Sequence, residues 1–203
     1  MTEPTPTAPI PTVLPPPEPR TTEPTRCAWA GLADPMYLAY HDEEWGRPLK
    51  GDDEVFERVS LEAFQSGLSW LTILRKRENF RAAFDGFSIP KVAAYTEQDV
   101  ERLLGDAGIV RNRAKIEAAV ANARAALDLP GGLSELVWRY ADPDAPAPRT
   151  MADVPATTPG SKALAKELKK HGFRFVGPTT VYALMQAIGL VNDHIEGCPA
   201  RTR

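Results

Sequence analysis

Apolar side chains recur every three to four positions along most of the chain after residue 25, which is the spacing of one helix face. Val55, Phe56 and Val59 form one such stripe. Asp52 or Asp53, just before it, suits the N-cap of a helix. The alternation of apolar and polar residues that marks a half-buried strand is nearly absent. The pattern therefore predicts an all-α fold.

Further along the chain, residue types that start or stop helices indicate where the elements lie. Thr96 and Asp99 have the spacing of a capping box. Ser161 suits the N-cap of a later helix, and Pro178 suits the first turn of the last one. Proline and glycine interrupt the pattern over residues 129–160, which predicts a long loop there.

Composition excludes several classes of protein. Two cysteines cannot build a disulfide-rich secreted scaffold, and the apolar runs are too short to cross a membrane. The net charge of −3 excludes a general polycation, so a nucleic-acid partner would need a local basic face. The N-terminal residues contain no basic stretch leading into an apolar core, so we expect no secretory signal. We expect a cytoplasmic protein that acts as a monomer.

The first 25 residues differ in composition from the rest. They hold nine of the chain's 20 prolines and no aromatic residue. Such a segment lacks the apolar mass for a core, so we expect a disordered tail over residues 1–25 and one folded domain over residues 26–203. A tether without a specific ligand is favoured over a proline-rich recognition motif.

Both cysteines and two of the three histidines lie near the two ends of the predicted domain: Cys27 and His41 at one end, His194 and Cys198 at the other. Two thiolates and two imidazoles complete a tetrahedral Zn²⁺ shell, which leaves no position for a reactive water. Such a site would be structural and would clip the two ends together. Buried free cysteines and unrelated histidines explain the spacing equally well.

A dense group of aromatic residues surrounds one acid: Tyr37, Tyr40, Trp45, Glu62 and Trp70. Glu62 falls on the apolar stripe of its helix, where an unpartnered carboxylate costs several kcal/mol. Aromatic residues at this spacing are more often core than pocket, but the acid on the stripe makes a binding pocket equally plausible. Flat aromatic walls with a hydrogen-bond acceptor suit a purine.

Positive charge gathers in three places. Solvated helix faces explain any one cluster, whereas three around a nearly neutral domain favour a phosphate-binding face. The third cluster leads into a glycine-containing turn before Pro178, whose backbone N–H groups suit a phosphate oxygen. The clusters are Arg75, Lys76, Arg77 and Arg81; Arg111, Arg113 and Lys115; and Lys162, Lys166, Lys169, Lys170 and Arg174.

Taken together, seven ordered segments resemble the bacterial DNA-3-methyladenine glycosylase I family, within the helix-hairpin-helix glycosylase superfamily. The resemblance runs from Arg26 to about Cys198. The matching segments are residues 27–29, 37–46, 66–70, 76–79, 106–109, 175–177 and 189–194.

The resemblance implies a helix-hairpin-helix glycosylase fold and an enzyme that hydrolyses the N-glycosidic bond of 3-methyladenine in double-stranded DNA. It implies one structural zinc ion on Cys27, His41, His194 and Cys198. It also implies that Glu62 and Tyr40 hydrogen-bond the base, that Trp70 stacks on it with Tyr37 and Trp45 nearby, and that Gly67 and Leu68 enter the duplex. The hairpin around Gly177 and Thr179, with Lys170 and Arg174, would contact the phosphates.

Some positions depart from the family pattern or bear on the chemistry. The chain has the proline-rich tail, one extra residue between Cys27 and His41, and Phe64 where a polar residue is expected. Thr179 stands where strand-cleaving relatives carry a lysine, which predicts an enzyme that leaves an abasic site without cutting the strand. We expect Asp193 to support His194 rather than a sugar cation.

Two other functions remain open at the level of sequence. A non-catalytic DNA-binding module explains the basic clusters but gives Glu62 no purpose. A zinc hydrolase needs an open coordination position.

Overall fold

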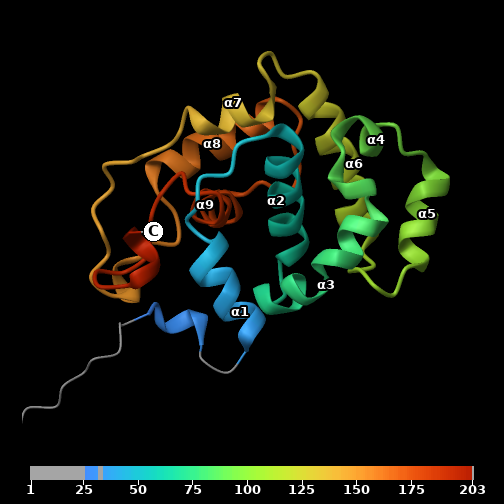
Figure 1. Ribbon diagram of the computed structural model, residues 1–203. Coiled ribbons are helices and arrows are strands. Elements are labelled where there is room, and N and C mark those ends of the chain that lie inside the picture. Colours follow the sequence, from blue (N-terminus) through green and yellow to red (C-terminus); the bar gives the residue numbers. More distant parts are fainter. Residues whose placement is uncertain (1–25, 32–33, 203) are drawn as a thin grey trace, which may run out of the picture.

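The computed structural model describes residues 26–31 and 34–202 (Figure 1). The prediction of a disordered tail over residues 1–25 lies outside the described residues. Within them the chain forms helices and connecting segments with no β-strand, which confirms the all-α prediction. No helix in this part of the chain is long and apolar enough to cross a membrane.

The α-helices differ widely in length, and short 3-10 helices and one π-helical turn (Tyr40–Glu44) connect them. The 3-10 helices are Ala28–Ala30, Asp85–Phe87, Met151–Asp153 and Pro199–Thr202. In chain order the α-helices are α1 (Pro35–Ala39), α2 (Asp52–Gln65), α3 (Trp70–Ala83), α4 (Ile89–Ala93), α5 (Glu97–Gly105), α6 (Arg113–Leu127), α7 (Gly132–Trp138), α8 (Pro159–Lys170) and α9 (Pro178–Ala187).

Helix α2 lies at the centre of the fold, between α9 on one side and α4 and α6 on the other (Figure 1). It also packs against α3 and α7. Val55, Phe56 and Val59 are buried, as the apolar stripe predicts. Phe64 is fully buried as well and packs against Phe80, with 4.7 Å between ring centroids. Phe64, where the resemblance led us to expect a polar residue, is therefore part of the core.

Two acids at the start of α2 serve other helices, so the prediction that they cap α2 is wrong. The N-cap of α2 is Gly51. The carboxylate of Asp52 accepts the backbone N–H of Ser134 at 2.7 Å, and that of Asp53 accepts the N–H of Ile89 at 2.8 Å. These two N–H groups belong to the first turns of α7 and α4. N–H groups in the first turn of a helix have no partner within that helix, so the two carboxylates supply one.

Two of the other predicted helix starts are confirmed and one is wrong. The capping box of Thr96 and Asp99 is formed, and Pro178 stands in the first turn of α9. The N-cap of α8 is Thr158; Ser161 completes its capping box three residues later. The predicted loop over residues 129–160 contains α7 and a 3-10 helix, because Leu133 and Val137 bury their side chains against the core despite weak local propensity.

The two ends of the described chain come together. The C-terminal 3-10 helix packs against the turn Tyr40–Glu44, on the side where the N-terminal segment also lies (Figure 1). Gly189, with a φ of +76°, lies so close to the backbone of Arg47 and Pro48 that a Cβ atom would come within 2.7 Å of the carbonyl carbon of Arg47. Only glycine fits this approach.

Candidate functional site

Cys27, His41, His194 and Cys198 form one buried cluster, although Cys27 and His194 are 167 positions apart in the sequence. Their four potential ligand atoms lie within 4.8 Å of one another. The Sγ atom of Cys198 is 3.6 Å from Nε2 of His41 and 3.6 Å from Nδ1 of His194. This group can hold a metal ion, and two sulfur and two nitrogen donors are the set that Zn²⁺ prefers.

The second ring nitrogen of each histidine has a partner that leaves the other nitrogen facing the cluster. Nε2 of His194 lies 2.9 Å from the carbonyl oxygen of Trp45, and Nδ1 of His41 lies 2.7 Å from Oδ1 of Asp42. Arg26 in turn binds Asp42. Burial lowers the pKa of His194 to about 4, so its imidazole is neutral at pH 7, as a ligand must be. The surroundings fit a metal site.

Beside this cluster lies a cavity of about 360 Å³, a volume typical of small-molecule sites. Aromatic rings make up much of its wall, and the rings of Tyr40 and Trp70 lie 5.3 Å apart. The predicted group of Tyr37, Tyr40, Trp45, Glu62 and Trp70 lines it together. The cavity is also lined by Trp29, Gln65, Met151, Val154, Pro155, Ala156, Thr179, Tyr182, Ala183 and Gln186.

Glu62 projects from α2 into this aromatic cavity and is only 5% exposed. Burial raises the pKa of its carboxyl group from 4.5 to about 8, and the nearby Arg58 only partly offsets this. The carboxyl group is therefore largely protonated in the empty cavity at neutral pH. A cation placed beside it would favour the carboxylate, because an opposite charge lowers the pKa of an acid.

The raised pKa predicts a specific pH dependence of stability. Protonated Glu62 favours the folded state below about pH 4.5, and this contribution is lost as the pH rises through the folded pKa of about 8. The free energy of unfolding of Glu62→Gln minus that of wild type should therefore be roughly 1–2 kcal/mol larger at pH 8 than at pH 6. Urea unfolding of both proteins at the two pH values measures this increase. Glu54→Gln, an exposed change on the same helix, should show none.

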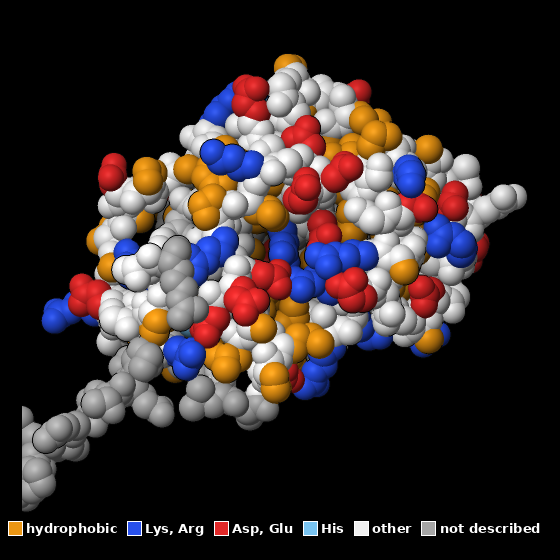
Figure 2. All heavy atoms as spheres, viewed as in Figure 1, with side chains coloured by type: hydrophobic (Ala, Val, Ile, Leu, Met, Phe, Trp, Pro, Cys, Tyr) orange, Lys and Arg blue, Asp and Glu red, His pale blue; other side chains and the backbone are white. Residues whose placement is uncertain are grey.

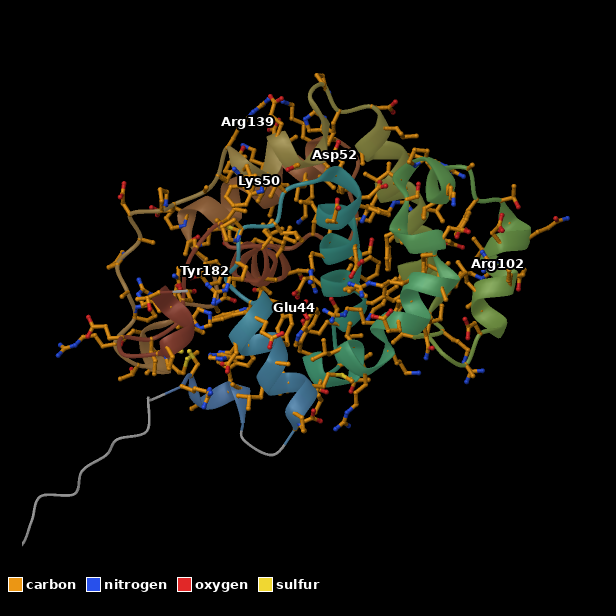
Figure 3. The ribbon with its side chains drawn as sticks, viewed as in Figure 1. Glu44, Lys50, Asp52, Arg102, Arg139 and Tyr182 are labelled. Atoms are coloured by element: carbon orange, nitrogen blue, oxygen red, sulfur yellow. The ribbon has the colours of Figure 1, made fainter. Side chains whose placement is uncertain are left out.

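An ion-pair network around Glu44 lies next to the ring of Tyr40. The carboxylate of Glu44 accepts hydrogen bonds from Arg58 at 2.6 Å and from Arg77 at 2.6 and 2.9 Å. Figure 3 shows Glu44 between the N-terminal segment and α2 and α3. The guanidinium of Arg58 lies 6.0 Å from the ring centroid of Tyr40, within reach of a cation–π contact. This network fixes one wall of the cavity.

Asp193 does not support His194, contrary to the sequence prediction. Its carboxylate accepts hydrogen bonds from the hydroxyl of Tyr182 at 2.5 Å and from the amide of Gln186 at 2.8 Å. Both donors lie on α9 and line the cavity, and Figure 3 shows Tyr182. Asp193 is buried, so it needs these donors. The adjacent His194 is oriented by Trp45 instead.

The predicted DNA-contacting residues lie on two loops or on the helix ends next to them. Gly67, with a φ of +84°, and Leu68, 42% exposed, form the loop between α2 and α3. Gly177 is the N-cap of α9 at the end of the α8–α9 hairpin, and Thr179 lines the cavity from the first turn of that helix. Arg174 in the hairpin is exposed, as is Lys170, which also pairs with Glu167.

Several of the clustered basic residues are engaged by acids or by the interior rather than by solvent. Arg77 pairs with Glu44, and Arg113 pairs with Glu97 and Glu101. Lys115 is buried. Figure 2 shows Lys and Arg side chains interspersed with Asp and Glu over the face in view. The expectation of three basic clusters forming one phosphate face is therefore wrong for these residues, because ion pairs occupy Arg77 and Arg113 and backbone carbonyl groups occupy Lys115.

Sequence reasoning missed part of the cavity wall. Trp29 enters the sequence analysis only as part of the matching segment 27–29, yet it lines the cavity and its ring lies 4.9 Å from that of Trp45. Met151 and Pro155 come from the segment over residues 129–160 that was predicted to be a long loop. Tyr182 and Gln186 lie four residues apart on α9, so their shared helix face was a usable signal.

The sequence matches the methyladenine glycosylase family over residues 29–202. It is 49% identical over 178 residues to DNA-3-methyladenine glycosylase 1 of Escherichia coli (strain K12), which covers 85% of this chain and 95% of that protein. It is 43% identical over 183 residues to DNA-3-methyladenine glycosylase of Haemophilus influenzae, which covers 88% of this chain and 98% of that protein.

The fold also matches solved structures of this family. A crystal structure of 3-methyladenine DNA glycosylase I superposes with a TM-score of 0.83 at 48% identity, covering 86% of this chain and 98% of that one. The Staphylococcus aureus enzyme, solved in a study of 3-methyladenine recognition, superposes with a TM-score of 0.83 at 38% identity and covers 87% and 96%.

Proposed function

This chain belongs to the methyladenine glycosylase family, and we propose that it removes 3-methyladenine from DNA by hydrolysing the bond between base and sugar inside the cavity that Glu62 and Trp70 line. The observation that carries the mechanism is the burial of one carboxyl group among aromatic rings. A non-catalytic DNA-binding module would keep such a group at a cost to stability and gain nothing from it.

The base is bound by charge, hydrogen bonds and stacking together. Methylation at N3 makes adenine in DNA cationic, and Glu62 faces it as a hydrogen-bond acceptor for the exocyclic amine, aided by Tyr40. Trp70 stacks on the ring, a contact worth roughly 1–3 kcal/mol. Tyr37 and Trp45 complete the wall. The cation favours the carboxylate of Glu62, so the cavity selects a charged purine over neutral adenine.

The chemistry depends mainly on the leaving group. The bond between the base nitrogen and the anomeric carbon breaks, its electron pair stays with the base, and neutral 3-methyladenine departs. A water oxygen then adds to the anomeric carbon and releases a proton to solvent, which leaves an abasic site. Glu62 is the only carboxyl group among the described cavity-lining residues, and no lysine is among them. We therefore infer a monofunctional enzyme without strand cleavage.

Double-stranded DNA meets the enzyme through the two loops that flank the cavity. Leu68, next to Gly67, fills the space that the extruded nucleotide leaves, as apolar wedges do. Backbone groups around Gly177 and Thr179 bind phosphate oxygens, together with the side chains of Lys170 and Arg174. We propose that the enzyme acts as a monomer in the cytoplasm, where the DNA of a bacterial cell lies.

One zinc ion on Cys27, His41, His194 and Cys198 completes the proposal. The donor chemistry, the complete burial and the oriented imidazoles support it. When bound, the ion neutralises two thiolates and joins the ends of the domain. Four protein ligands fill its shell, so the site is structural, and this argues against a zinc hydrolase.

The proposed reaction predicts which products form from alkylated DNA. Incubation of the full chain with duplex DNA treated with a methylating agent should release free 3-methyladenine, identified by chromatography, while the strands remain intact on a denaturing gel. Subsequent alkali should cut the strands at the abasic sites. Release of no base contradicts glycosylase activity, and strands cut without alkali contradict the monofunctional mechanism.

A further inference from the structure

Helix α6 contacts both loops of the proposed DNA face through buried polar side chains. The ammonium of Lys115 donates to the carbonyl oxygens of Phe64 at 2.9 Å and of Ser66 at 2.6 Å. Asn122 accepts the backbone N–H of Arg174 at 2.7 Å and donates to its carbonyl oxygen at 3.1 Å. Lys115 is 7% exposed and Asn122 is not exposed. They lie two helical turns apart, about 10 Å along the axis.

Lys115 fixes the start of the loop that carries Leu68. Helix α2 ends at Gln65, where carbonyl groups lack partners within the helix, and a cation there also interacts favourably with the helix dipole. The carbonyl of Ser66 lies only two residues before Leu68. Burial lowers the pKa of Lys115, which shows that its desolvation is costly. An apolar residue would fill the same space without this cost, so the ammonium has another role.

Asn122 fixes the backbone of the α8–α9 hairpin, as Lys115 fixes that of the Leu68 loop. Arg174 precedes Phe175, an exposed non-glycine residue with a φ of +56°. Such a backbone conformation costs about 1–3 kcal/mol unless its surroundings enforce it. The two hydrogen bonds between Asn122 and the backbone of Arg174 hold the adjacent peptide groups and so fix the hairpin that leads into α9.

We propose that α6 sets the distance between the Leu68 loop and the hairpin, with Lys115 and Asn122 as positioning residues for the engagement of duplex DNA. This inference rests on the proposed function, in which Leu68 fills the duplex and the hairpin holds phosphates. Because both loops must meet one duplex at once, a shift of about 1 Å in either is sufficient to slow the reaction.

A double-mutant cycle tests the role of Lys115. Lys115→Met should slow single-turnover release of 3-methyladenine from duplex DNA about tenfold, because it removes hydrogen bonds from a charged donor. In a Leu68→Ala background the same change should have no further effect, since the positioned side chain is absent. Binding of free 3-methyladenine should be unchanged, because the cavity is intact.

Asn122→Leu tests the second positioning residue. It should weaken binding to duplex DNA about tenfold. In the double variant this loss of affinity should add to the loss caused by Leu68→Ala, because Asn122 acts through the hairpin. Lys91→Met, an exposed change on α4 that removes the same charge, should leave both quantities at wild-type values. If Lys115→Met does not fold, Lys115→Gln, which keeps an N–H donor, replaces it in the cycle with a smaller expected loss.

Three outcomes overturn this inference. The first is a wild-type rate for the Lys115 variant. The second is an equal loss of rate with and without the Leu68 side chain, and the third is an equal loss in free-base binding; each of these two marks a merely structural role. If the wild-type chain itself releases no base, the proposed function fails instead, so the two failures are distinguishable.

Discussion

Glu62→Gln should slow single-turnover release of 3-methyladenine from duplex DNA by about 100-fold, the largest effect expected from one substitution in the cavity. The amide is neutral, so it no longer attracts the cationic base. The amide also has one acceptor oxygen in place of two, and a neutral acceptor forms a weaker hydrogen bond with the exocyclic amine than a carboxylate does. Binding of free 3-methyladenine, measured by calorimetry, should weaken as well.

The same variant separates activity from stability. Because burial raises the pKa of Glu62 to about 8, the substitution that slows the reaction should also stabilise the fold at pH 8. Glu54→Gln should change neither quantity. A Glu62→Gln variant with wild-type kinetics would move the base-binding site away from this cavity.

Loss of the metal should have the largest effect on stability. Closing a loop that joins the two ends of the domain removes unfolded-state entropy of about 4–5 kcal/mol, by analogy with a disulfide. Cys27→Ser or chelation should therefore lower the melting temperature by about 10–15 °C. Metal analysis of the wild-type protein should give one zinc ion per chain.

The third histidine provides the matched control. His171 interacts with Glu167 on α8 and lies outside the cluster. His171→Gln should keep the zinc ion and the wild-type melting temperature. A wild-type protein that contains no metal, yet melts at the same temperature before and after chelation, would contradict the structural role of the ion.

Local sequence patterns predicted the helical class and several helix ends because their causes are local. The stripe of Val55, Phe56 and Val59 depends only on the period of the helix, and the capping box of Thr96 and Asp99 spans four consecutive residues. The acid at position 62 was conspicuous for the same reason: it interrupts an apolar stripe.

Contacts between distant segments were decided by the tertiary structure. Asp52 serves α7 rather than its own helix, and Asp193 serves Tyr182 rather than the adjacent histidine. Spacing alone left the Cys and His residues ambiguous; only the folded chain shows His41 and Cys198 in one cluster. Local rules fix which residues form helices. Which polar groups meet depends on how the helices pack, because each buried donor or acceptor takes the partner that packing brings within reach.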